Sequence, residues 1–201
     1  MSRRPPSQSP SAAALRAAHG RSIDDVIGPG LRVLFCGINP SLYSAAVGRH
    51  FARPGNRFWP ALHQAGFTPR RLTAAVQPEL LSLGYGITNV VARATATAAE
   101  LSTEDYLAGG RALARKLRRY QPRVIAFLGI GAYRIVSGHR NTGVGPAPEP
   151  FADTAAWVLP NPSGLNAHYQ LDALAAELAR LSAWIRRAST PGGSAATVGR
   201  R

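Results

Sequence analysis

Two short apolar runs, each followed by an Asn-Pro pair, constrain the fold of this chain more than any other feature. Residues 31–36 (LRVLFC) lead into Gly-Ile-Asn-Pro-Ser at 37–41, and residues 156–160 (AWVLP) lead into Asn-Pro-Ser-Gly-Leu-Asn at 161–166. Short apolar runs bounded by Gly or Pro are typical of buried strands. Open α/β sheets bind their ligands at the carboxyl ends of strands. The sequence therefore predicts two strand ends that flank one cleft, and we expect the chemistry there.

Strand-like and helix-like segments alternate along most of the chain. Apolar runs predict strands, and apolar residues at helical spacing after a capping residue predict helices. We expect strands at 31–37, 85–88, 123–129 and 155–159, helices at 56–65, 102–120, 130–136 and 171–185, a short helix within 77–83, and a loop at 138–150. Strands separated by helices favour a parallel sheet. The predicted fold class is α/β, a single domain with a central, mainly parallel sheet flanked by helices on both faces.

Length and composition suit one folded domain with a tail at each end. The chain has 201 residues, of which 45% are hydrophobic. Residues 1–22 are basic and rich in Pro and Ser, and residues 188–201 are rich in Gly, Ser, Ala and Thr, so we expect both to be disordered around a folded domain at 23–187. No apolar run approaches the length of a membrane span and no signal peptide is recognisable. We expect a cytoplasmic monomer with no membrane contact.

Basic residues strongly outnumber acidic ones. The chain has 24 Lys and Arg against 10 Asp and Glu, a formal net charge of +14. Such an excess predicts a polyanionic partner, most often nucleic acid. A general preference for Arg is the alternative explanation, because Lys116 is the only lysine. The basic cluster at 115–119 is expected on a solvated helix face, with phosphate contact as the alternative.

Five sequence motifs occur in an order that resembles one enzyme family. The motifs are GINPS (37–41), FARPGNRFWPAL (51–62), GYGITNVV (84–91), LAGGRAL with YQPRVIAFLG (107–113 and 120–129) and WVLPNPSGLN (157–166). Their order and spacing resemble the mismatch-specific uracil/thymine DNA glycosylase family. The resemblance implies a uracil-DNA glycosylase-like fold and a monofunctional enzyme without a cofactor. Such an enzyme removes uracil, and in some members thymine or other modified bases, from G·U and G·T mispairs of double-stranded DNA, which initiates base-excision repair.

Asn39 is the candidate catalytic residue. Cleavage of an N-glycosidic bond leaves positive charge on the sugar and negative charge on the base, so the enzyme needs a flipped base, a positioned water and donors for the base. The carboxamide of Asn39 can hold a water, but it cannot remove a proton as a carboxylate would. We therefore expect a slow enzyme that prefers bases that leave easily. The alternative is that Asn39 only closes a turn before Pro40.

The resemblance also implies a base pocket around Phe51. An aromatic face at this position stacks on the flipped base, and backbone N–H groups near Ile38 and Phe51 bind its carbonyl oxygens. Ser44 is a candidate lining residue in the loop after the first motif, and Asn89 borders the pocket, where it would tune which base is accepted. The alternative for Phe51 is a place in the hydrophobic core. Asn56 is expected to cap the following helix.

The loop at 161–166 is expected to contact DNA. Removing a nucleotide from the stack leaves a gap and an unpaired partner base, and an apolar side chain on a stiff loop can fill that gap. The resemblance implies that Leu165 is this wedge and that Gly164 lets the backbone approach the opposite guanine. The other candidate contacts to the opposite strand are Asn161, Ser163 and Asn166. The alternative is a tight turn whose Leu165 folds back on the core.

Other chemistries find little support in the residues. Cys36 is the single cysteine and lies in a predicted strand, and the five histidines show no ligand spacing, so no metal site is predicted. Glycosylases that also cut the strand use an amine, and a surface position for Lys116 argues against this activity. One departure from the family pattern is Ala92, where members often carry an acid. Its loss removes a possible partner of Arg93.

Two other functions stay open at this level. A catalytically weak or inactive relative would bind mispaired or damaged DNA, although both Asn39 and Phe51 are intact. An α/β enzyme acting on a free nucleotide or phosphorylated metabolite would need neither the Leu165 loop nor the large positive charge. The expected partner is double-stranded DNA that contains mispaired uracil or thymine.

Overall fold

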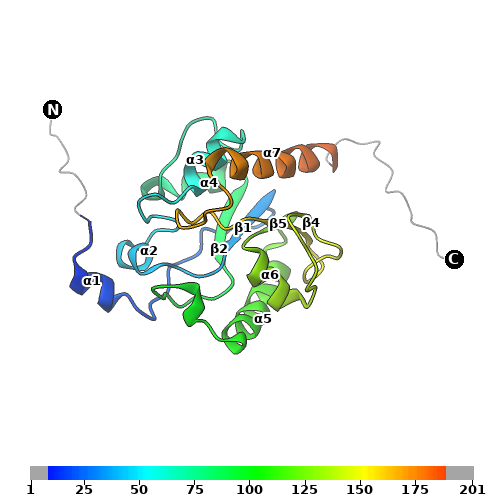
Figure 1. Ribbon diagram of the computed structural model, residues 1–201. Helices are drawn as coiled ribbons and strands as arrows, with labels where there is room; N and C mark the ends of the chain where they lie inside the picture. Colours follow the sequence, from blue (N-terminus) through cyan, green and yellow to red (C-terminus); the bar gives the residue numbers. More distant parts are fainter. Residues whose placement is uncertain (1–8, 189–201) are drawn as a thin grey trace.

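The predicted sheet is present in the computed structural model of the chain, which describes residues 9–188 (Figure 1). The strands are β1 (Val33–Gly37), β2 (Tyr85–Asn89), β3 (Val124–Leu128), β4 (Gly145–Pro146) and β5 (Ala155–Leu159). They lie in the order β2-β1-β3-β5-β4, and only the pairing of β4 with β5 is antiparallel. The predicted α/β class and mainly parallel sheet are confirmed.

Helices cover both faces of this sheet. They are α1 (Ala12–Ala17), α2 (Leu42–Val47), α3 (Phe58–Gln64), α4 (Glu79–Ser82), α5 (Thr103–Tyr120), α6 (Ile130–Ser137) and α7 (Leu171–Ala188), with short 3-10 turns at Ala74–Val76 and Ala98–Glu100. Figure 1 shows α3 and α7 on one side of the sheet and α5 and α6 on the other. No helix among residues 9–188 is long and apolar enough to cross a membrane.

The two faces of the sheet have separate cores because alternate strand residues point to opposite sides. Val33 and Phe35 of β1 pack with the cluster beneath α3 and α7, whereas Leu34 and Cys36 pack with the cluster beneath α5 and α6. Every residue of β1, β2 and β3 is buried. A sheet covered on both faces needs strands that are apolar throughout, which explains the continuous apolar runs of the sequence.

The N-terminal part of the chain corrects the expectation of a disordered tail at 1–22. Helix α1 lies inside that segment, and the Ser11 side chain caps it by accepting the N–H of Ala14 at 3.2 Å. Ala18, at the end of the helix, is fully buried in a cluster with Ala45 and Ala94. The prediction is therefore wrong for this helix. Residues 1–8 and 189–201, which make up most of the remaining predicted tails, lie outside the described residues.

Three further elements differ from the prediction. Helix α2 replaces the expected loop after the first motif, because the Ser41 hydroxyl accepts the N–H of Ser44 and starts a helical turn. Strand β4 lies within the expected loop at 138–150. Helix α3 begins at Phe58, and the Asn56 side chain still serves its first turn by accepting the N–H of Phe58 at 2.9 Å.

Lys116 does not lie on the solvated face that the sequence predicts. Its Nζ is 2.5 Å from Oδ2 of Asp25 and 3.1 Å from Oγ1 of Thr88. Next to Asp25, Val26 forms an antiparallel bridge with Ile87 of β2. The ion pair therefore fastens the segment before β1 to the sheet edge and to α5. Arg115, Arg118 and Arg119 are exposed, as expected for the rest of that cluster.

Candidate active site

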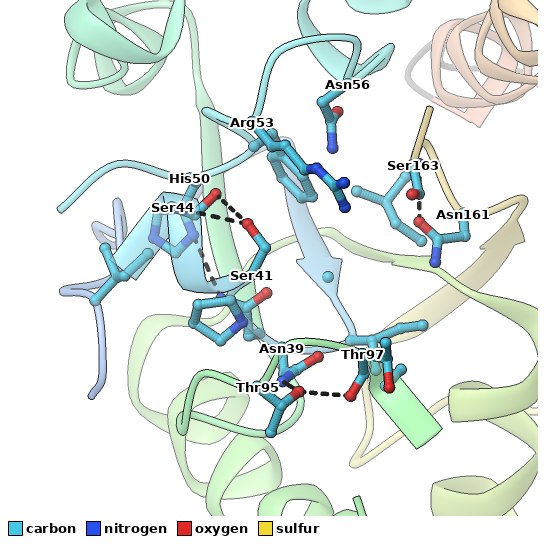
Figure 2. A pocket seen from close by; sticks show the side chains of 18 of the residues that line it. Asn39, Ser41, Ser44, His50, Arg53, Asn56, Thr95, Thr97, Asn161 and Ser163 are labelled. Carbon is cyan, nitrogen blue, oxygen red and sulfur yellow. Dashed lines mark hydrogen bonds between the residues drawn. The ribbon is translucent and has the colours of Figure 1, made fainter. Parts of the chain in front are cut away.

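A cavity opens where β1, β2 and β5 end, and both Asn-Pro junctions contribute to its lining. The site residues proposed from the sequence that line it are Ile38, Asn39, Ser44, Phe51, Asn89, Asn161, Ser163 and Leu165. Gly164 and Asn166 are not among the lining residues. Figure 2 shows Asn39 and Asn161 approaching the cavity from different sides.

Asn39 follows β1, and the loop after β2 holds its side chain. Asn39 Nδ2 donates to the carbonyl oxygen of Arg93 (3.1 Å) and to Oγ1 of Thr95 (2.7 Å). The Thr95 hydroxyl donates to the carbonyl oxygen of Thr97 at 2.7 Å, so toward Asn39 it can only accept (Figure 2). Both amide hydrogens are therefore used, and Asn39 Oδ1 bonds to no described residue. The side chain does not close its own turn, and its oxygen remains an acceptor at the cavity.

An ion pair fixes the loop that holds Asn39. Arg93 makes a two-point contact with Asp105, from Nε to Oδ1 at 3.0 Å and from Nη2 to Oδ2 at 2.7 Å, and Nη2 also donates to the carbonyl oxygen of Glu100. The hydrogen bond from Arg93 holds the pKa of the Asp105 carboxyl well below its usual range. The acid that is absent at Ala92 is thus replaced by Asp105 from α5, and Arg93 keeps a partner.

Phe51 forms part of the cavity wall in a backbone conformation that is rare for residues other than glycine. Its φ is 51°, in the left-handed region, where such residues often occur at functional sites. The ring stacks on that of Phe58, with centroids 4.2 Å apart, so it also borders the core. A Cβ at Gly37 would lie 3.2 Å from Cζ of Phe51, so the glycine at the end of β1 packs closely against this ring. Phe51 thus lies both at the cavity wall and against the core, and stacking on a base stays a prediction.

Several backbone N–H groups at the cavity make no hydrogen bond to another described residue, and two of them are groups that the sequence predicts to bind the base. These two belong to Ile38 and Phe51, which lie outside the helices and strands. Backbone N–H groups away from water are nearly always paired, so these two are available to carbonyl oxygens of a ligand. They are the groups to which the sequence expectation assigned base binding.

A buried histidine that the sequence analysis did not select orients Asn89. His50 Nε2 lies 3.0 Å from the carbonyl oxygen of Asp24, which can only accept, so Nε2 carries the hydrogen. His50 Nδ1 is then the acceptor for Asn89 Nδ2, at 3.4 Å. Burial lowers the pKa of His50 and so favours the neutral ring. The Asn89 oxygen faces the end of β1, where a side chain at Gly37 would overlap it.

Ser44 borders the cavity, but the protein itself engages its hydroxyl. Ser44 Oγ accepts the N–H of Ala52 at 3.2 Å and lies 3.1 Å from the donating hydroxyl of Ser41. Ala52 directly follows Phe51, so this bond supports the turn that carries the aromatic ring. Ser44 therefore stabilises the wall of the cavity.

The second junction forms a turn closed by its own side chains. Asn161 Oδ1 accepts the N–H of Ser163 at 3.0 Å, and Asn166 Nδ2 donates to the carbonyl oxygen of Asn161 at 3.0 Å. The Ser163 hydroxyl accepts the N–H of Leu165 at 3.3 Å. The loop is thus stabilised by hydrogen bonds from the side chains of Asn161, Ser163 and Asn166.

Leu165 stands at the tip of this loop with 75% of its surface exposed. The alternative in which it folds back on the core is therefore wrong. Next to it, a Cβ on Gly164 would lie 2.6 Å from the carbonyl oxygen of Gly55, so glycine is needed where the loop meets the segment before α3. Leu165 is more exposed than the other large hydrophobic residues at the surface of residues 9–188, which are at most 39% exposed.

The described residues that line the cavity include no carboxylate. Their hydrogen-bonding side chains are amides, hydroxyls, Arg53 and His50, and both ring nitrogens of His50 are engaged. Among residues 9–188 no group of three or more His, Cys, Asp and Glu residues could hold a metal ion. Burial raises the pKa of the Cys36 thiol, which makes it a poor nucleophile. The site can hold a water and a flat ring, but it offers no general base.

Comparison with known proteins identifies the family and the fold of the chain. The family model of the uracil DNA glycosylase superfamily matches residues 25–184. A solution NMR structure from Methanosarcina acetivorans, described as that of a candidate uracil DNA glycosylase, resembles the chain with a TM-score of 0.55 at 18% sequence identity. The similarity covers 83% of this chain and 98% of that one, which shows a shared fold. The family match spans both Asn-Pro junctions.

Proposed function

The chain belongs to the uracil DNA glycosylase superfamily, and we propose that it hydrolyses the N-glycosidic bond of uracil in G·U mispairs of double-stranded DNA. Thymine in G·T mispairs and other modified pyrimidines are further substrates in this proposal. The observation that carries it is the orientation of Asn39, whose amide hydrogens are both bound so that Oδ1 faces the cavity.

In the proposed reaction, Asn39 Oδ1 accepts a hydrogen bond from a water placed against the anomeric carbon of a flipped nucleotide. A bond forms from the water oxygen to C1′ as the C1′–N1 bond breaks, and the bonding electrons leave with the base. The N–H groups of Ile38 and Phe51 stabilise the negative charge on the carbonyl oxygens of the base. The excess proton of the water passes to solvent. Because the cavity has no carboxylate to remove that proton, the rate follows how readily the base leaves.

The exposed loop supplies the second half of the proposal. Leu165 enters the space that the flipped nucleotide vacates, and the backbone near Gly164 approaches the widowed guanine. A mispaired base is easier to extrude than one in a Watson–Crick pair, which favours G·U and G·T substrates. The formal charge of +14 supports binding to the phosphate backbone.

Single-turnover base release tests this function. We expect alkali-labile sites in a labelled G·U duplex and fewer in a G·T or A·U duplex. Asn39→Ala should lower the rate by about 100-fold or more, the effect of removing one preorganised polar group from a transition state. Asn141→Ala, at an exposed site in the 138–150 loop, is the matched control and should release uracil at the native rate.

The same assay decides between the proposal and its competitors. Binding of the G·U duplex without base release by the unmodified protein would indicate a mispair-binding protein. No preference for duplex DNA, and no steep loss of binding with added salt, would indicate an enzyme of free nucleotides.

A further inference from the structure

Arg57, just before α3, contacts the Leu165 loop through both terminal nitrogens of its guanidinium group. Its Nη1 donates to the carbonyl oxygens of Ser163 (3.0 Å), Asn166 (2.9 Å) and Tyr169 (3.1 Å), and its Nη2 donates to the carbonyl oxygen of Gly164 (3.2 Å) and to Oε1 of Gln170 (2.8 Å). The backbone N–H of Arg57 also donates to the carbonyl oxygen of Pro162 at 2.9 Å. One residue thus contacts the loop over most of its length.

These contacts dominate the connection between the loop and the rest of the protein. Apart from one helical bond at the start of α7, from the N–H of Leu174 to Gln170, every hydrogen bond between residues 161–170 and the rest of the described chain comes from Arg57. The other hydrogen bonds of the loop join its own residues. Without Arg57, those local turns would have few polar anchors.

The hydrogen-bond acceptors around Arg57 are all neutral. Within residues 9–188 it forms no ion pair with Asp or Glu. Neutral carbonyl oxygens surround it instead, and the planar guanidinium can serve several acceptors at once in a way that a lysine cannot. Both terminal nitrogens are already bound to the loop, so a DNA phosphate could reach them only by displacing loop oxygens. The geometry favours a role in the shape of the loop.

We propose that Arg57 is the positioning residue that sets the Leu165 loop in its insertion-ready shape before DNA binds. The proposal rests on the proposed function, because only an enzyme that extrudes a nucleotide needs a wedge. Ordering a loop during binding costs conformational entropy, and a loop that is already ordered avoids this cost. Arg57 therefore acts on extrusion through Leu165 and does not touch the base.

Hydrogen exchange tests the proposal without any need for catalysis. In Arg57→Met, the amides of residues 163–169 should exchange at least about tenfold faster, because the turns that protect them lose their anchor. The Arg115→Met variant is the matched control, since Arg115 is an exposed arginine on α5. In this variant the amides of residues 163–169 should exchange at the native rate. Unchanged exchange in Arg57→Met would overturn the proposal.

A double-mutant cycle with Leu165 tests whether the order of the loop matters for function. Arg57→Met and Leu165→Ala should each slow uracil release from a G·U duplex about tenfold, and the double variant should be no slower than the slower single one. Fluorescence of 2-aminopurine beside the uracil should show the loss in the extrusion step. Arg57→Lys should fall between Arg57→Met and the unmodified protein, since lysine keeps the charge but lacks the planar fork.

The outcomes separate this inference from the proposed function. If the unmodified protein releases no uracil, the proposed function fails, and hydrogen exchange still decides the role of Arg57 in the loop. A different result is that uracil is released while the fold-losses in rate of the two substitutions multiply in the double variant, or while Arg57→Lys releases uracil at the native rate. In either case Arg57 acts as a phosphate contact or a general support, and the inference is wrong. Should Arg57→Met fail to fold, Arg57→Lys with Leu165→Ala forms the same cycle.

Discussion

The two Asn-Pro junctions have the same dipeptide at the end of a parallel strand, yet they use their asparagines in opposite ways. Asn39 is bound by a distant loop through both amide hydrogens, which leaves its oxygen toward the cavity. Asn161 turns its oxygen back on its own loop, where it accepts the N–H of Ser163. The contrast teaches that surrounding hydrogen bonds, and not the motif itself, separate a residue suited to chemistry from one suited to loop shape.

The largest expected effect comes from exchanging each asparagine for alanine. Asn39→Ala should lower uracil release by about 100- to 1,000-fold, because the water loses its acceptor. Asn161→Ala should lower it by only about fivefold, because one turn hydrogen bond contributes about 1 kcal/mol. Single-turnover rates on one G·U duplex measure both. If the two variants lose the same factor in the rate of uracil release, the two asparagines do not differ in function as proposed.

Removing the apolar tip tests the second junction by itself. Leu165→Ala should weaken the affinity for DNA carrying an abasic site by about tenfold, the scale of burying most of a leucine side chain. The effect should appear in product affinity and extrusion and not in the bond-breaking step. Leu107→Ala, at an exposed site on α5, serves as the control. If Leu165→Ala binds abasic-site DNA with the native affinity, Leu165 does not act as a wedge.

A smaller effect is expected from the hydroxyl that orients Asn39. Thr95→Val removes the acceptor of one amide hydrogen and lets the carboxamide rotate, so uracil release should fall by about fivefold. Thr95→Ser keeps the hydroxyl and should restore the rate. The dissociation constant for the G·U duplex should stay the same in both. If Thr95→Ser is as slow as Thr95→Val, the methyl group matters and the hydroxyl does not.

The smallest effect concerns the buried histidine beside the first junction. Burial lowers the pKa of His50 from 6.5, so the unfolded chain takes up this proton before the folded one does. The neutral His50 ring makes its full contribution to the unfolding free energy above pH 6.5, and this contribution is lost as the pH falls below 6.5. His50→Gln should therefore lose less unfolding free energy than the native protein between about pH 7.5 and about pH 5.5 in urea titrations.

His168→Gln is the control for this titration, because His168 is exposed. It should lose unfolding free energy with falling pH as the native protein does. An identical pH dependence in His50→Gln and the native protein would mean that His50 is not held neutral by its surroundings.

The sheet and both junctions could be predicted from the sequence because their signals are local. A strand buried on two faces is a continuous apolar run, and Gly or Pro marks where it ends. The composition of residues 1–22 obscured α1, since a short Ala-rich helix with one Ser cap resembles a disordered tail. Its stability comes from packing against α2 and the loop that holds Ala94.

The supports of the site could not be read from local pattern. Lys116 finds Asp25, and Asn39 finds Thr95, only after distant segments fold together. His50 was overlooked because a single histidine without ligand spacing gives no signal of its own. Arg57 is the extreme case, since its loop partners are mostly backbone carbonyl oxygens, which any sequence provides.

The most direct test of the account is a crystal structure of the protein on a G·U duplex whose deoxyuridine carries a 2′-fluorine. The fluorine disfavours positive charge on the sugar, so the intact nucleotide should be trapped. We expect uracil against the Phe51 ring, and one ordered water that bonds to Asn39 Oδ1 and faces C1′ opposite the base. A uracil bound elsewhere, or an Asn39 oxygen that bonds to the base or to the protein in place of water, would contradict it.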